Sequence, residues 1–205
     1  MKEIRYPSLE VAEKLLQKSE AKNPGAWIEH SRYTAFVCER IAQYCPHLDK
    51  EKAYLLGLLH DIGRYVGVVS ERHLLEGYLL CHENGWDEVA RICVTHSYML
   101  QDITSSIGVW DVSDEDYQLM KIVIETSEYN DYDRLVQLAD ALALPTGVCI
   151  IEKRLVDVVL RYGFHPHTIA RWRKTFEIKN YFEAIMGLSI YQVLCEPTEI
   201  PELVF

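Results

Sequence analysis

Apolar residues recur at intervals of three and four along most of the chain, and no stretch alternates between apolar and polar positions as a half-buried strand does. The first pattern places apolar side chains on one face of a helix. We therefore expect an all-α fold, with a loop at residues 99–112. The helices are expected at residues 8–22, 26–45, 49–63, 71–84, 87–98, 113–128 and 133–144.

Polar and small residues mark the ends of these helices. Ser8 and Asp49 precede two of them, and such side chains accept hydrogen bonds from the free N–H groups of a first turn. Gly63 is expected to terminate the third helix, and Pro145 the seventh. The doublet His60-Asp61 is therefore expected at the end of a helix.

A second group of helical stretches follows Pro145. Residues 149–162 and 168–186 have helical spacing, and a short stretch then leads to a proline-containing tail at residues 197–205. The turn Pro145-Thr146-Gly147 is too short to act as a flexible linker. We expect one globular helical bundle, with a core at residues 1–145 and a helical extension at residues 146–205 packed on that core.

The composition is that of a globular protein, with 49% hydrophobic and 25% charged residues among 205. No apolar run approaches the length of a spanning helix, the first residues do not resemble a signal peptide, and the six cysteines include no CxxC pair. We therefore expect a cytoplasmic protein with reduced thiols and no membrane partner.

The formal net charge is −10, and no run of lysine or arginine forms a basic stripe. Such a charge repels nucleic acid, so no nucleic-acid partner is expected. A small anionic substrate remains compatible with it, because a metal ion and one or two arginines can reverse the local field. The sequence does not predict an oligomeric state.

Asp140 lies within an apolar segment, residues 135–144. An ionised carboxylate buried alone is unfavourable by many kcal/mol. The side chain is therefore protonated, paired with a base, exposed on a narrow polar strip, or bound to a metal. The segment alone leaves these four alternatives open.

Three histidines also occupy apolar surroundings. His30 shares a helical stripe with Trp27 and Val37, His60 follows a run of leucines, and His96 follows Ile92 at helical spacing. A single buried imidazole is usually only a hydrogen-bonded core residue. Several imidazoles and carboxylates together favour a metal, because one ion satisfies them all.

The combination of ligand types indicates a class of metal. Imidazole with carboxylate suits iron, manganese, zinc, cobalt or nickel better than calcium or magnesium, and the absence of thiolate ligands disfavours a closed structural zinc site. Coordination positions left open by the protein would be available for catalysis.

The sequence resembles a known family at these positions. His30, the segment His60-Asp61-Ile62-Gly63 and Asp140 are similar to the H…HD…D signature of the HD-domain superfamily. His73 followed by Gly77, and His96 within Thr95-His96-Ser97, resemble two further elements of the dinuclear H…HD…H…H…D subgroup. That subgroup includes the bacterial symmetrical diadenosine tetraphosphatase-like proteins. The resemblance covers residues 27–144 and not the extension.

This resemblance implies a ligand set and a reaction. His30, His60, Asp61 and Asp140 would hold one metal ion, while His73 and His96 would complete a second site with Asp61 bridging. Such relatives often carry iron. The implied activity is hydrolysis of a phosphate ester or anhydride by metal-activated water, with a nucleotide or a dinucleoside polyphosphate as the expected substrate.

Arg64 follows this signature where relatives often show lysine. It would assist Asp61 in catalysis by binding phosphate through two N–H groups. A solvated surface arginine is the alternative interpretation, and the departure from lysine leaves the exact substrate open. Two other functions also remain: an HD-type di-iron oxygenase, and a non-catalytic module that senses a nucleotide.

The remaining candidates have ordinary structural explanations. His82 is expected to face away from His73, and His47, His165 and His167 lie in loops. The segment 130–134 resembles a helix cap with ion pairs, although substrate contact is the alternative. Glu152, Arg154 and Arg161 either line a pocket mouth or form surface pairs. The 13 tyrosines and 4 tryptophans suit core packing or, alternatively, base stacking.

Overall fold

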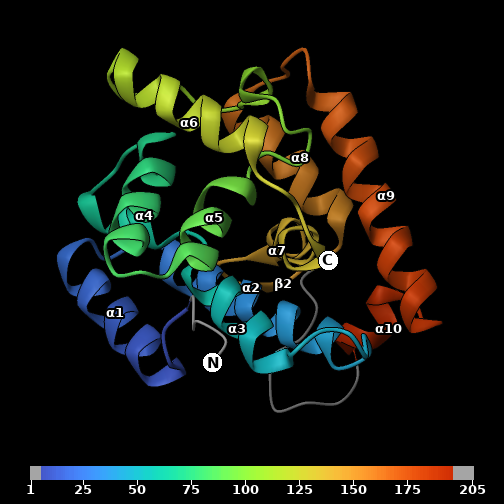
Figure 1. Ribbon diagram of the computed structural model, residues 1–205. Helices are drawn as coiled ribbons and strands as arrows, with labels where there is room; N and C mark the ends of the chain where they lie inside the picture. Colours follow the sequence, from blue (N-terminus) through green and yellow to red (C-terminus); the bar gives the residue numbers. More distant parts are fainter. Residues whose placement is uncertain (1–5, 196–205) are drawn as a thin grey trace.

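The computed structural model describes residues 6–195 and confirms the all-α class (Figure 1). The expected proline-containing tail lies outside the described residues. The α-helices are α1 (Leu9–Lys22), α2 (Trp27–Ala42), α3 (Lys50–Leu59), α4 (Arg72–Glu83), α5 (Asp87–Thr95), α6 (Asp114–Thr126), α7 (Asp131–Asp140), α8 (Ile151–Tyr162), α9 (Thr168–Met186) and α10 (Ile190–Cys195). Short 3₁₀ helices, η1 (Ile62–Val66) and η2 (Ile103–Ser105), and strands β1 (Ala143–Leu144) and β2 (Gly147–Val148) complete the fold.

Side-chain caps begin several of the helices at the expected residues. The side chains of Ser8 and Asp49 accept hydrogen bonds from backbone N–H groups in the first turns of α1 and α3. At the start of α7, Asn130 accepts from the backbone while the Asp133 carboxylate accepts from Asn130 N at 2.8 Å. This capping box confirms the interpretation of segment 130–134 as a helix start.

The expected end of the seventh helix is wrong. Helix α7 ends at Asp140, because the chain then forms an antiparallel hairpin. Each strand of the hairpin has two residues, and Ala143 pairs with Val148. Pro145 lies in the turn between the strands rather than directly after a helix. Asp140 is therefore the last residue of α7. Helices α2 and α5 likewise end about three residues before their expected ends.

The expected role of Gly63 is also wrong. Helix α3 ends at Leu59, and Gly63 lies inside η1 rather than at a helix terminus. A Cβ atom at Gly63 would lie only 1.9 Å from His73 O and 2.4 Å from Gly77 N. Glycine is therefore required because η1 lies directly against α4. This close approach brings Asp61 and His73 together.

The main hydrophobic core extends from the first helices into the C-terminal extension. Buried side chains of α2, α3, α5 and α7 form one cluster with Ile178, Phe182 and Ile190 of α9 and α10. Helix α7 lies in the middle of the bundle, and α9 runs along one side of it (Figure 1). The extension thus shares the core, while the domain boundary at residue 145 stays a prediction.

Two further observations concern the whole chain. Within residues 6–195, every helix is too short or too polar to cross a lipid bilayer. All six cysteines are free thiols, and five of them are buried while Cys195 is exposed.

Candidate metal centre

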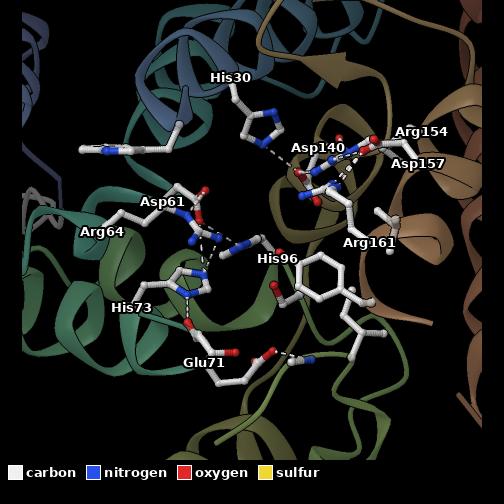
Figure 2. Close-up of a pocket in the computed structure, with 18 of the residues that line it drawn as sticks. His30, Asp61, Arg64, Glu71, His73, His96, Asp140, Arg154, Asp157 and Arg161 are labelled. Atoms are coloured by element: carbon white, nitrogen blue, oxygen red, sulfur yellow. Dashed lines mark hydrogen bonds and ion pairs between the residues drawn. The ribbon is translucent and has the colours of Figure 1, made fainter. Parts of the chain in front are cut away.

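Six residues predicted as metal ligands converge from five parts of the fold, and Figure 2 labels five of them, all except His60. Helix α2 supplies one histidine, the end of α3 supplies the His-Asp doublet, and α4, the end of α5 and the end of α7 supply one residue each. Because the doublet follows the last residue of α3, its two side chains are free of regular helical spacing. The six residues are His30, His60, Asp61, His73, His96 and Asp140.

Backbone carbonyl groups fix the orientation of three imidazoles. The Nδ1 atom of His60 lies 2.7 Å from Gly57 O, and that of His96 lies 3.0 Å from Ile92 O. His73 Nδ1 contacts Ser70 O in the same way. Because a carbonyl oxygen only accepts, each Nδ1 carries the proton, and in the neutral ring Nε2 has a free lone pair.

These Nε2 atoms gather around the Asp61 carboxylate. His73 Nε2 and His96 Nε2 lie 3.2 Å and 3.7 Å from Asp61 Oδ1, and His60 Nε2 lies 3.9 Å from Oδ2. Among residues 6–195, Asp61 Oδ1 and His60 Nε2 are nevertheless buried without a hydrogen-bond partner. A cation would satisfy these facing acceptors, so the residues fit a metal site.

The protonation of the histidines agrees with this arrangement. Burial lowers the pKa of His60 to about 3, although Asp61 acts in the opposite direction. Burial also lowers the pKa of His96. Both rings are therefore neutral near pH 7, and neutral imidazole is the form that binds a metal.

The ligand atoms form two overlapping groups. One comprises His30, His60 and Asp61, and the other comprises Asp61, His73 and His96; within each group the ligand atoms lie within 4.8 Å of one another. Asp61 belongs to both. Five of the six predicted ligands thus lie in these two groups, and neither group includes Asp140.

Asp140 is paired with bases. Its Oδ1 atom lies 2.8 Å from His30 Nε2 and 3.1 Å from Arg154 Nη2, and its side chain is 28% exposed. Burial would raise the pKa of Asp140, but Arg154 and His30 hold it well below its usual range. Asp140 therefore borders the centre through His30, whose own Nδ1 is buried and has no hydrogen-bond partner in the described part of the chain.

Arg64 lies on the other side of the centre from Asp140 (Figure 2). Its Nε donates to Asp61 Oδ2 at 2.6 Å, and its Nη2 lies 3.3 Å from His73 Nε2. Burial alone would lower the pKa of Arg64, but Asp61 raises it above the usual value. The interpretation as a solvated surface arginine is wrong, because the guanidinium contacts two of the predicted ligands.

A cavity of about 560 Å³ opens beside these residues. One part of its wall comes from predicted ligands and another from the extension, including Arg154, Arg161 and Arg171. The structure thus places Arg154 and Arg161 in the cavity wall, although Arg161 also forms an i,i+4 pair with Asp157. Arg171 was not among the sequence candidates, since the helical pattern around it carries no recognisable motif.

The other histidines do not line the cavity. His82 is exposed and contacts Asp87 at 3.1 Å, and His47 contacts Asp131 at 2.8 Å. His165 contacts the Tyr162 carbonyl, and His167 lies 3.4 Å from Thr104 Oγ1. Glu152 contacts Tyr191 and does not line the cavity. The structural interpretation of these residues agrees with their positions.

Comparison with known proteins identifies one family. The sequence model of the HD domain matches residues 27–144, which is more than half of the chain and contains all six predicted ligands. No curated protein and no solved structure matches the chain significantly. HD domains are all-α proteins and in general metal-dependent phosphohydrolases. With its signature residues assembled around Asp61, this chain belongs to the HD domain family.

Proposed function

We propose that the protein is a metal-dependent hydrolase that cleaves a phosphate ester or anhydride of a nucleotide or dinucleoside polyphosphate. The observation that carries the proposal is the group of three oriented imidazoles around Asp61, in which Asp61 Oδ1 and His60 Nε2 are buried and have no hydrogen-bond partner among the described residues. This arrangement is suited to a cation and leaves the adjoining cavity open to a substrate.

Two metal positions are supported by the overlapping groups. His30, His60 and Asp61 would hold one ion, with Asp140 beside it, and Asp61, His73 and His96 would hold the second. Iron is the first candidate from the resemblance, and manganese, zinc, cobalt and nickel suit the same ligands. A bound divalent ion supplies Lewis acidity and lowers the pKa of water toward neutrality.

The protein's own residues orient the centre and the substrate. Carbonyl groups of the backbone hold three imidazoles in the tautomer needed for metal binding. Asp61 contributes an ionised carboxylate, since the Arg64 guanidinium holds its pKa well below the usual range against the effect of burial. Arg64 lines the cavity and can donate through more than one N–H group to a phosphate.

The cavity supports a nucleotide-sized substrate. Its volume of about 560 Å³ lies in the range of small-molecule sites. Four arginines line it beside four carboxylates, so guanidinium donors for a phosphate are present in a chain of net charge −10. Trp27 and Trp172 also line it and offer aromatic faces to a base.

The test is elemental analysis of protein purified without added metal, followed by a phosphatase screen over mononucleotides and dinucleoside polyphosphates. We expect about two transition-metal ions per chain and phosphate release from members of this panel. Absence of hydrolysis by metal-loaded protein across the panel would overturn the proposal in favour of a nucleotide sensor. Oxygen-dependent turnover with a mixed-valence iron signal would overturn it in favour of an oxygenase.

A further inference from the structure

The four arginines that line the cavity differ in their partners. Arg64 contacts Asp61 at 2.6 Å, Arg154 contacts Asp140 at 3.1 Å, and Arg161 contacts Asp157 at 2.7 Å. Each of these three guanidinium groups is therefore largely balanced by a carboxylate. The fourth, Arg171, has no ion pair with any carboxylate in the part of the chain that the structure describes.

Neutral groups hold Arg171 in place. Its Nη1 atom donates to Ser97 O at 2.7 Å and to Ser105 O at 3.1 Å, which ties α9 to the segment after α5. Within residues 6–195, its Nε and Nη2 atoms have no hydrogen-bond partner. Neither atom is fully buried, so both remain accessible. The guanidinium is thus fixed through one nitrogen while two others remain able to donate to a ligand.

The surroundings leave the positive charge of Arg171 incompletely compensated. Burial lowers the pKa of Arg171, and the nearby Glu71 only partly opposes that effect. Glu71 itself accepts hydrogen bonds from Tyr98 Oη and from Gly108 N, both at 3.0 Å. A half-buried cation without a carboxylate partner is stabilised by a bound anion.

The position of Arg171 relates it to the metal centre. One of its two anchoring carbonyl groups belongs to Ser97, the residue directly after His96, and both residues line the same cavity as Arg171. Arg171 lies in the first turn of α9, a turn without acidic residues, and Thr168 of that turn also lines the cavity. The positive end of the α9 dipole adds to the attraction for an anion.

We propose that Arg171 forms an anion subsite that binds a second, non-reacting phosphoryl group of the substrate. The proposal rests on the proposed function, because the reacting phosphoryl group is placed at the metal centre. It assigns the extension a role in selecting substrates with two or more linked phosphoryl groups. The HD domain match ends at residue 144, so this subsite lies outside the matched region.

The test compares two nucleotide analogues that resist cleavage, α,β-methylene-ADP and the phosphonate analogue of AMP. Binding to the metal-containing protein is measured by calorimetry for the native chain, Arg171→Gln, Arg171→Lys and Arg173→Gln. Arg173 is the matched control, because it is an exposed arginine on the same helix and does not line the cavity. Thermal unfolding of each variant reports whether the fold is retained.

We expect Arg171→Gln to weaken binding of α,β-methylene-ADP about tenfold or more and to change binding of the one-phosphonate analogue less than about threefold. Arg171→Lys should restore part of the loss, and Arg173→Gln should change neither affinity. Equal losses for both analogues, or no loss, would overturn the subsite, as would absence of measurable binding to the folded native chain. Because binding is measured without turnover, an Arg171-dependent preference in a protein that hydrolyses nothing would overturn the proposed function alone.

Discussion

Arg154 of α8 lies against Asp140 at the end of α7, with its Nη2 atom 3.1 Å from Asp140 Oδ1. Its Nε also donates to the backbone carbonyl of Asp140 at 3.3 Å. Asp140 belongs to the stretch that matches the HD domain, whereas Arg154 belongs to the extension. The extension therefore supplies a positive charge directly beside the candidate metal centre.

The first prediction concerns Arg154→Gln. In metal-free protein we expect this variant to lower the free energy of unfolding by about 1–3 kcal/mol, because Asp140 loses its charged partner. A bound metal should offset part of that loss, so metal addition should raise the melting temperature more in the variant than in the native chain. Chemical denaturation and thermal unfolding, each with and without a chelator, measure both effects.

Arg161→Gln is the matched control for that prediction. Arg161 lies on the same helix and in the same cavity, but its guanidinium pairs with Asp157 and its side chain is 45% exposed. We expect a loss of less than about 1 kcal/mol, because exposed ion pairs contribute little to stability. Equal stability losses in the two variants, or an unchanged response of Arg154→Gln to metal, would contradict the assigned role of Arg154.

The second prediction concerns the His60-Asp61 doublet. We expect His60→Ala and Asp61→Ala each to lower the bound metal and to abolish turnover, because Asp61 belongs to both ligand groups and His60 to one. Most helicity should remain, since both residues follow the last residue of α3. Elemental analysis, activity assays and circular dichroism measure the three properties.

His82→Ala is the control histidine variant. The His82 side chain is 59% exposed and contacts the exposed Asp87 and the Tyr78 ring. We expect metal content and turnover to be close to those of the native chain. Full activity in either doublet variant would refute the metal centre, whatever the behaviour of His82→Ala.

The third prediction concerns Gly63→Ala. The added Cβ would lie 1.9 Å from His73 O, so η1 and α4 must separate, and we expect a loss of more than about 3 kcal/mol in stability. Gly187→Ala is the control, because Gly187 has a positive φ of 66° and open space around it. Backbone strain alone should cost about 1–2 kcal/mol there. A smaller loss at Gly63 than at Gly187 in urea denaturation would contradict this account.

Most helices could be predicted from the sequence because helical periodicity and capping residues are local signals. The capping box of α7 is an example, since Asn130 and Asp133 lie within one turn. The early end of α7 could not be predicted in this way. It depends on pairing between Ala143 and Val148, and the apolar residues before Pro145 continue the helical pattern past Asp140.

The candidate centre was also predictable only in part, because some of its contacts join segments that are distant in the sequence. Buried imidazoles and acids are visible in the sequence as polar residues in apolar surroundings, which is why His30, His60, His96 and Asp140 could be identified as candidates from the pattern alone. The contributions of Arg154 and Arg171 depend on how the extension packs against α7 and the loop after α5. Their spacing along a helix contains no information about that packing.

The fourth prediction concerns pH and the contact between the core and the extension. Asp131, at the start of α7, accepts hydrogen bonds from Tyr181 Oη of α9 at 2.7 Å and from Arg134 Nη1 at 2.7 Å. Burial would raise the pKa of Asp131, but these bonds lower it below its usual value. A depressed pKa in the folded state stabilises the fold above the unfolded pKa, and that stabilisation is lost as the pH falls through the folded pKa.

We therefore expect Asp131→Asn to lower the free energy of unfolding by about 1–2 kcal/mol at pH 7. As the pH falls from about 4 through the lowered pKa of Asp131, the native chain should lose this contribution and approach the variant. Urea denaturation of both proteins from pH 7 to pH 3 measures the difference. Asp131 does not line the cavity and belongs to neither ligand group, so metal content should be equal in the two proteins. A constant stability difference across this range would show that the Asp131 carboxylate does not carry the contact through its charge.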